Sequence, residues 1–183
     1  VQDDGVCSFL FVGRIMKEKG VDEFFAAAKT LKAEFGERVS FDIVGFYEDA
    51  YKETVEKLVD DGIVNFHGFQ SNVHPFYEKT DCVVLPSYHE GMSNVLLEGA
   101  ATGRPLITSD ISGCREAVED GVSGYLCKPQ DVDGLCAAMQ KCVCSSHEER
   151  ENMGKIGRTR MEKHFSKQAV VAATIQALGF KND

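Results

Sequence analysis

The sequence contains no apolar run approaching the roughly 20 residues that a helix needs to span a lipid bilayer. Its N-terminus also lacks the charged segment followed by an apolar segment that is typical of a secretory leader. The first residue is valine rather than methionine, so we interpret the 183 residues as an excised fragment or a processed chain. These features predict a chain without a transmembrane segment whose residues 1–183 form a single domain.

The sequence contains fewer basic than acidic residues. The 20 lysines and arginines are outnumbered by 29 aspartates and glutamates, which gives a formal net charge of −9. A protein that binds DNA or RNA needs a positive field to attract the phosphate backbone, so the composition argues against a nucleic-acid partner. It leaves room for a local basic site that binds one small phosphate ligand.

Several motifs of common cofactor and metal sites are also missing. The turn after the first apolar segment reads Gly13-Arg14-Ile15, which is not the G-x-G-x-x-G of dinucleotide-binding folds, and no G-x-x-x-x-G-K-[ST] loop occurs. His89-Glu90 is not followed by a second histidine at the spacing of zinc proteases, because position 93 is serine. NAD-dependent enzymes and ATPases of those kinds are therefore disfavoured, and no metal site is predicted.

The seven cysteines form no Cys-x-x-Cys pair, and their number is odd. Cys142 and Cys144 fall two residues apart on a helical pattern, where side chains point to different sides, so they make a poor metal-binding pair. We interpret the cysteines as reduced, buried thiols of a cytosolic protein.

What the sequence does contain is a regular alternation of strand and helix patterns. The strand segments are continuous apolar runs, and the helical segments have apolar residues at helical spacing. This pattern predicts an α/β, Rossmann-like, doubly wound parallel sheet of about six strands with helices on both faces. The expected strands are 7–12, 39–44, 64–68, 82–86, 105–109 and 124–127; the expected helices are 21–35, 48–60, 73–79, one running from Ser93 past Glu98, a brief one in 112–117, one capped by Asp131, and 148–164 and 167–178.

Polar and glycine-rich segments follow four of the predicted strands: 13–14, 67–69, 87–94 and 109–113. Ligands of open parallel sheets bind outside the carboxyl ends of the strands. The segments that carry chemistry are therefore expected to lie where the fold places its binding crevice.

Two glutamates, Glu90 and Glu98, are separated by seven residues in the segment 87–98. Glu90 falls on the loop after a buried strand, and Glu98 falls in the early turns of the next helix, for which Ser93 or Asn94 is a natural N-cap. Free N–H groups at a helix N-terminus bind anions, so hydroxyl-binding carboxylates beside them suit a sugar nucleotide. The alternative is that Glu98 is a solvated helix residue, although its neighbours are mostly apolar or small.

The loop 13–20 places Arg14 and Lys19 just beyond the first strand. An arginine fork and a lysine point charge suit a diphosphate, particularly one that gains charge as a leaving group. The alternative is a polar loop with solvated cations, and the loop alone does not decide between the two.

Taken together, these residues resemble a known family. Gly13-Arg14 with Lys19-Gly20, the Glu90/Glu98 spacing and the run 103–108 (GRPLIT) look like the C-terminal, donor-binding half of the retaining glycosyltransferases of family 4. Those enzymes have the two-domain GT-B fold. The run 112–116 (SGCRE) is similar to that of bacterial members that build capsule and surface polysaccharides. The resemblance covers essentially the whole chain.

The resemblance implies a catalytic group of Glu90, Arg14 and Lys19. Arg14 and Lys19 would hold the donor diphosphate, and Glu90 would contact hydroxyls of the donor sugar. No cofactor or metal is implied in this half, only the nucleotide-sugar donor as substrate. The donor is expected to be a UDP-sugar.

Other residues would complete the donor site. Glu98 would hold the ribose hydroxyls, the loop from Gly91 to Val95 would offer backbone N–H groups, and the segment 66–69 would flank the base. Many members carry Phe-Gly and an apolar residue where this chain has Met92-Ser93-Asn94, so the identity of the sugar stays open. The donor-binding residues implied are Gly13, Arg14, Lys19, His67, Phe69, Glu90, Gly91, Met92, Ser93, Asn94, Val95 and Glu98.

The implied function is transfer of a hexose-type sugar to a hydroxyl acceptor with retention of configuration, in bacterial glycan synthesis. A glycan or lipid-linked acceptor would bind through an N-terminal domain that is absent from this chain. Two alternatives remain at this stage: a UDP-sugar epimerase of similar architecture, and a module that binds a nucleotide sugar without chemistry. The expected location is cytoplasmic, with the full-length protein either free or peripheral at the inner membrane.

Overall fold

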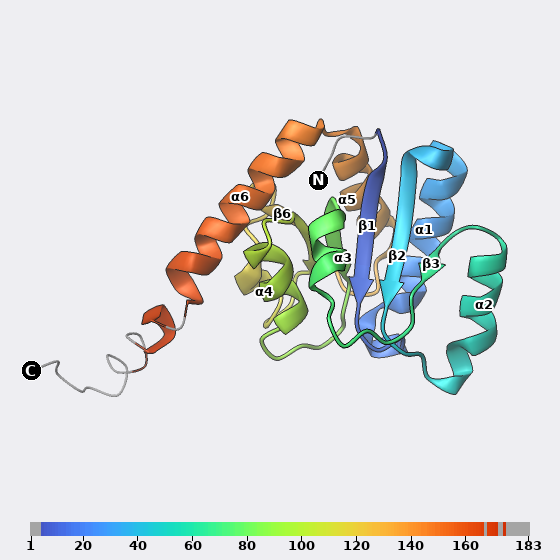
Figure 1. The fold of residues 1–183 in the computed structure, drawn as a ribbon, viewed down its shortest axis with the longest axis horizontal. Coiled ribbons are helices and arrows are strands. Elements are labelled where there is room, and N and C mark those ends of the chain that lie inside the picture. Colours follow the sequence, from blue (N-terminus) through green and yellow to red (C-terminus); the bar gives the residue numbers. More distant parts are fainter. Residues whose placement is uncertain (1–4, 167, 172–173, 175–183) are drawn as a thin grey trace, which may run out of the picture.

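A single sheet of six parallel strands forms the centre of the molecule (Figure 1). The structure is a computed structural model and describes residues 5–166, 168–171 and 174. The strand order β3-β2-β1-β4-β5-β6 is that of a doubly wound α/β fold, which confirms the predicted fold class. The strands are β1 (Cys7–Val12), β2 (Val39–Val44), β3 (Asn65–Phe66), β4 (Cys82–Leu85), β5 (Leu106–Ser109) and β6 (Gly124–Cys127).

Aromatic side chains fill the core beside the central strands. Phe9 of β1 and Phe41 of β2 are register partners, and their rings stack with centroids 5.5 Å apart. Phe24, from the helix that follows β1, meets the Phe41 ring edge-on at 6.2 Å. All three side chains are almost completely buried. These rings pack the helix that follows β1 against one face of the sheet.

Helices cover both faces of the sheet. Figure 1 shows α3 and α4 in front of it and α5 behind it; α1 packs against α5, and α4 packs against α6. Asp131 caps α5 as predicted, since its carboxylate accepts a hydrogen bond from the backbone N–H of Gly134. The helices are α1 (Val21–Phe35), α2 (Lys52–Asp60), α3 (His74–Lys79), α4 (Asn94–Ala101), α5 (Val132–Cys144) and α6 (His147–His164).

The element boundaries differ from the predictions at a few places. The strand expected over 64–68 is limited to Asn65–Phe66, because β3 is an edge strand and Gly68 turns the chain with φ of 66°. The helix expected over 48–60 begins with a 3-10 turn, Asp49–Tyr51. The helix expected over 167–178 lies largely outside the described residues.

All seven cysteines are free; six are buried, as expected, and Cys144 is exposed. Among the described residues, no helix has the length and apolar character required to cross a membrane.

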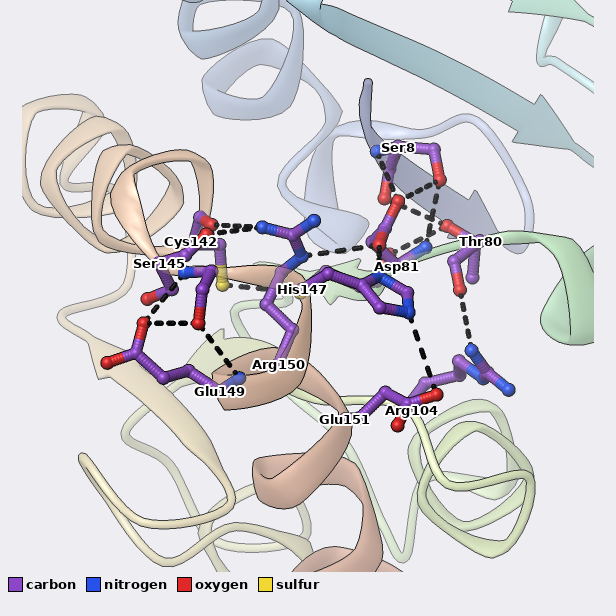
Figure 2. Close-up of polar contacts among 12 residues, drawn as sticks. Ser8, Thr80, Asp81, Arg104, Cys142, Ser145, His147, Glu149, Arg150 and Glu151 are labelled. Atoms are coloured by element: carbon purple, nitrogen blue, oxygen red, sulfur yellow. Dashed lines mark hydrogen bonds and ion pairs between the residues drawn. The ribbon is translucent and has the colours of Figure 1, made fainter. Parts of the chain in front are cut away.

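A buried ion pair fastens α6 to the amino edge of the sheet, opposite the carboxyl edge (Figure 2). Arg150 of α6 lies 3.2 Å from a carboxylate oxygen of Asp81, which precedes β4, and both side chains are more than nine-tenths buried. The other oxygen of Asp81 accepts hydrogen bonds from the backbone N–H and the hydroxyl of Ser8 in β1. Arg150 also donates to the carbonyl oxygens of Cys142 and Ser145. The two central strands and the C-terminal helices are therefore joined at this edge.

Candidate functional site: the carboxyl edge of the sheet

The turns after β1 and β2 approach each other closely. Gly13 and Gly45 both have positive φ, and a Cβ atom at Gly45 would lie only 1.8 Å from the carbonyl oxygen of Gly13. The backbone N–H of Gly13 donates to the carbonyl of Val44 at 2.9 Å. Glycine at position 45 lets the two turns meet, and this contact fixes where the following residues, Arg14 and Phe46, emerge.

Arg14 is exposed at this edge and stacks on an aromatic ring. Its guanidinium carbon lies 5.4 Å from the centroid of the Phe46 ring, which is itself half exposed. Within the part of the chain that the structure describes, no carboxylate lies at ion-pair distance from Arg14. Its charge is therefore oriented by a neutral partner and available to an anion.

Lys19 and Glu90 lie in direct contact, although they are far apart in the sequence. The Lys19 Nζ atom is 2.5 Å from Oε1 of Glu90, and the Ser87 hydroxyl donates to the same oxygen at 2.8 Å. The Glu90 side chain is 12% exposed and that of Lys19 29% exposed, so the pair is partly shielded from water. The loops after the neighbouring strands β1 and β4 thus meet at these two charges.

The loop that leads into α4 is packed against the loop after β5. Ser93 is the N-cap residue, but its side chain makes no capping hydrogen bond; its backbone N–H instead donates to the carbonyl of Gly113. A Cβ atom at Gly113 would lie 1.6 Å from the carbonyl oxygen of Gly91, so glycine permits this approach too. The Glu116 carboxylate accepts from the N–H of Gly113 and holds that loop in place.

No acidic side chain lies in the first turn of α4. N–H groups of a first helical turn have no partner inside the helix and carry a partial positive charge. Because α4 follows the parallel strand β4, its N-terminus lies at the carboxyl edge of the sheet, as do Arg14 and Lys19 after β1. The edge therefore combines two cations with a helix N-terminus.

Glu98 lies on α4 at the margin of a cavity of about 630 Å³ between α3, α4 and the segment 71–73. The hydroxyl of Tyr77, a core residue 1% exposed, donates to Oε2 of Glu98 at 3.2 Å. Burial, and next the charge of Glu98, raise the pKa of Tyr77, so its hydroxyl remains a proton donor. This bond orients a carboxylate that is otherwise exposed.

Within the described part of the chain, the other residues predicted for the site form no hydrogen bond or ion pair with the side chains of Arg14, Lys19 or Glu90. The His67 ring contacts Asp42 of β2, with Nε2 and Oδ1 2.6 Å apart, and lies against the ring of Phe76. Phe69 is 70% exposed and Met92 49% exposed. The structure brings together Lys19 and Glu90, and places Gly91 beside Gly113; His67 and Phe69 follow the edge strand β3, at the end of the sheet.

Four residues at this edge were not predicted from the sequence: Tyr77, which holds Glu98; Phe46, on which Arg14 stacks; and Tyr88 and Glu23, which are hydrogen-bonded to each other. No motif or regular spacing marks these residues in the sequence. Their contacts join segments that are far apart along the chain. Among the residues that the structure describes, no group of three or more histidine, cysteine, aspartate or glutamate side chains could hold a metal ion.

Comparison with known proteins gives the family. Residues 7–145 match the family described as glycosyl transferases group 1. The chain belongs to this family. It is 33% identical over 175 residues to a glycogen synthase of Mycobacterium tuberculosis, covering 94% of this chain and 42% of that protein. It is 28% identical over 169 residues to the capsular polysaccharide biosynthesis glycosyltransferase CapM of Staphylococcus aureus, covering 87% of this chain and 42% of CapM.

Solved glycosyltransferases share the fold. A point mutant of TarM of S. aureus, solved with fondaparinux, α-GlcNAc-glycerol and UDP, aligns with a TM-score of 0.83 at 19% identity, over 94% of this chain and 35% of TarM. The C-terminal domain of the group 1 glycosyltransferase LpcC of Francisella tularensis aligns with a TM-score of 0.77 at 23% identity, over 88% of this chain and 87% of that domain. The chain thus spans less than half the length of these curated relatives, and about the length of that isolated domain.

Proposed function

We propose that the chain is the donor-binding domain of a retaining glycosyltransferase of family 4 and binds a UDP-sugar at the carboxyl edge of its sheet. The observation that carries the proposal is the contact between Lys19 and Glu90 beside the N-terminus of α4, with Arg14 close to the same edge. Cations and helix N–H groups match a diphosphate, and a carboxylate next to them matches sugar hydroxyls. Family membership and the UDP bound to TarM support the choice of ligand.

Each side chain has one task in this proposal. Arg14 and Lys19 hold the diphosphate and stabilise the charge that it gains when the bond to the sugar breaks. Glu90 accepts hydrogen bonds from the sugar hydroxyls, and Glu98, oriented by Tyr77, accepts them from the ribose. The bond between the sugar and the diphosphate breaks, the acceptor hydroxyl oxygen bonds to the sugar, and the hydroxyl proton passes to the departing nucleoside diphosphate.

Lys19 begins paired with Glu90, so a donor that binds must share the ammonium with that carboxylate. An incoming diphosphate offers Lys19 a second anion, while Glu90 gains hydroxyl donors from the sugar. Binding therefore adds charge-assisted hydrogen bonds from the ligand to two side chains that already lie in contact. No metal ion is needed in this scheme, because two side-chain cations face the diphosphate.

We propose further that residues 1–183 are one domain and that an N-terminal domain supplies the acceptor site. The low coverage of the relatives and the match to the isolated LpcC domain support this. The free thiols favour a reducing, cytoplasmic location. Transfer assayed on the full-length protein separates this proposal from a module that only binds the nucleotide sugar.

A thermal-unfolding panel with UDP, GDP, ADP, uridine and several UDP-sugars tests the ligand class. A ligand specific for the folded state stabilises it by RT ln(1 + [L]/Kd), about 2.7 kcal/mol at a hundredfold excess over Kd. We expect UDP and at least one UDP-sugar to raise the midpoint temperature more than GDP or ADP at equal concentration, with or without EDTA. No shift with any nucleotide would overturn the proposal, and a shift that EDTA abolishes would overturn the metal-free scheme.

A further inference from the structure

A second set of contacts, behind the Lys19–Glu90 pair, fastens the loop after β4 to the beginning of α1. The hydroxyl of Tyr88 donates to the carboxylate of Glu23, at 2.8 Å from Oε1 and 3.0 Å from Oε2. The backbone N–H of Tyr88 donates to the carbonyl oxygen of Glu18 at 2.8 Å. Tyr88 therefore bridges to residues on both sides of Lys19, while being two residues from Glu90.

Glu23 is unusual for an acidic residue, because it is only 8% exposed. A buried carboxylate requires hydrogen-bond donors, and Tyr88 supplies one. Burial, and next the hydrogen bond to Glu23, raise the pKa of Tyr88, so its hydroxyl stays a donor. The contact is thus a shielded, charge-assisted hydrogen bond rather than a solvated surface pair.

The backbone adds a constraint at the same place. Gly20 has φ of 71°, and a Cβ atom there would lie 2.0 Å from the carbonyl oxygen of Pro86. The loops 14–20 and 86–90 are thus in contact at Gly20 and Pro86, at Glu18 and Tyr88, and at Lys19 and Glu90. Of these contacts, only Lys19 and Glu90 bring two charged side chains to the surface where a ligand would bind.

We propose that Tyr88 and Glu23 are positioning residues that hold Lys19 and Glu90 at the spacing a donor diphosphate and its sugar require. The inference rests on the function proposed above. The Tyr88 ring and the Glu23 carboxylate do not touch the ligand. They act by fixing the loop after β4 against the first turn of α1, so that the ammonium is oriented before the ligand arrives.

The test is calorimetric titration of the chain with UDP and with uridine, which lacks the diphosphate. Tyr88→Phe keeps the ring and removes the hydroxyl; we expect the Kd for UDP to rise about tenfold, with the Kd for uridine within about twofold of wild type. Glu23→Ala is expected to behave in the same way. Glu23→Gln retains an acceptor for the Tyr88 hydroxyl and is expected to keep most of the UDP affinity.

Tyr51→Phe is a matched control. Tyr51 donates to Asp22, the residue beside Glu23, at 3.2 Å, and so makes a similar bond to the same helical turn without involving the loop after β4. It should leave the Kd values for UDP and uridine unchanged.

The outcomes separate the two proposals. Wild-type chain that fails to bind UDP would overturn the proposed function. Wild-type chain that binds UDP, with unchanged UDP affinity in Tyr88→Phe and Glu23→Ala, would overturn only the positioning role. Equal losses for UDP and uridine in those variants would also overturn it, because they would show a general structural effect.

Discussion

Glu90 and Glu98 occupy different surroundings, although the sequence presents them as a pair. Glu90 is mostly buried and bonded to Lys19 and Ser87, whereas Glu98 is exposed at the margin of a cavity and bonded to Tyr77. Removing a carboxylate that neutralises a cation should change ligand affinity differently from removing one that is bonded to a neutral hydroxyl. Their proposed ligands also differ, since Glu90 faces the sugar and Glu98 the ribose.

Alanine substitution should therefore separate them. Glu98→Ala should weaken UDP and UDP-sugar alike, by about ten- to hundredfold, because a hydrogen bond to a charged group contributes roughly 1.5–3 kcal/mol. Glu90→Ala should weaken only the UDP-sugar, and its UDP affinity should be at least that of wild type, because Lys19 loses its internal partner. Calorimetric titration of both ligands checks this.

Glu78→Ala is the matched control for these variants. Among the described residues, Glu78 forms its ion pair with the exposed His74, at 3.4 Å. It lines the cavity beside Glu98 but has no assigned contact with the donor, so neither ligand should bind differently. Equal losses of UDP affinity in Glu90→Ala and Glu98→Ala, or none in either, would contradict the division of roles.

The sequence could predict which charged residues share the edge, but not how each is held. Arg14, Lys19 and Glu90 each follow a recognisable strand, and the carboxyl ends of neighbouring parallel strands meet. Arg14 meets Phe46 from the turn after β2, Glu98 meets Tyr77 of α3, and Tyr88 reaches Glu23 of α1; the sequence pattern contains no information about which side chain reaches which. Ser93 or Asn94 was predicted as the N-cap, and Ser93 occupies that position; its buried side chain makes no capping hydrogen bond, and its backbone N–H donates to the carbonyl of Gly113 instead.

Among the elements, α6 is fixed by the buried pair of Arg150 and Asp81 (Figure 2). Removing one partner of a buried ion pair leaves an uncompensated charge, which costs about 3–5 kcal/mol. Arg150→Met should lower the free energy of unfolding by about that amount, as measured by urea denaturation. Arg158→Ala removes an exposed pair with Glu162 on the same helix and should cost less than about 1 kcal/mol. Similar losses of unfolding free energy in the two variants would show that the buried pair stabilises the fold no more than an exposed pair does.

Most elements were predicted to within a residue because their apolar patterns are strong. The range of α1 and those of β1, β2 and β6 match the predictions, and α6 begins one residue earlier than expected. An exception is β3, which is shorter than its apolar run, since an edge strand pairs on one side only. The pair of Asp81 and Arg150 left no trace in the sequence pattern, because its partners are 69 residues apart.

At the scale of the whole molecule, the sheet separates two tasks. Its amino edge holds the buried ion pair that joins α6 to the strands, and its carboxyl edge holds Arg14, Lys19 and the N-terminus of α4. Because the formal net charge is −9, the proposed phosphate ligand would have to be attracted by this local arrangement rather than by the overall field. The fold class followed from the alternation of strands and helices, whereas the ligand follows only from the residues at one edge.

The most direct test of the central proposal is calorimetric titration of the chain with UDP in the presence of EDTA, beside uridine as ligand and Arg14→Ala as variant. We predict that wild-type chain binds UDP without a metal ion, and that Arg14→Ala weakens UDP by about tenfold or more while leaving uridine nearly unchanged. The absence of UDP binding by wild-type chain, or UDP binding that requires added Mn²⁺ or Mg²⁺, would contradict a diphosphate site built from Arg14, Lys19 and the N-terminus of α4.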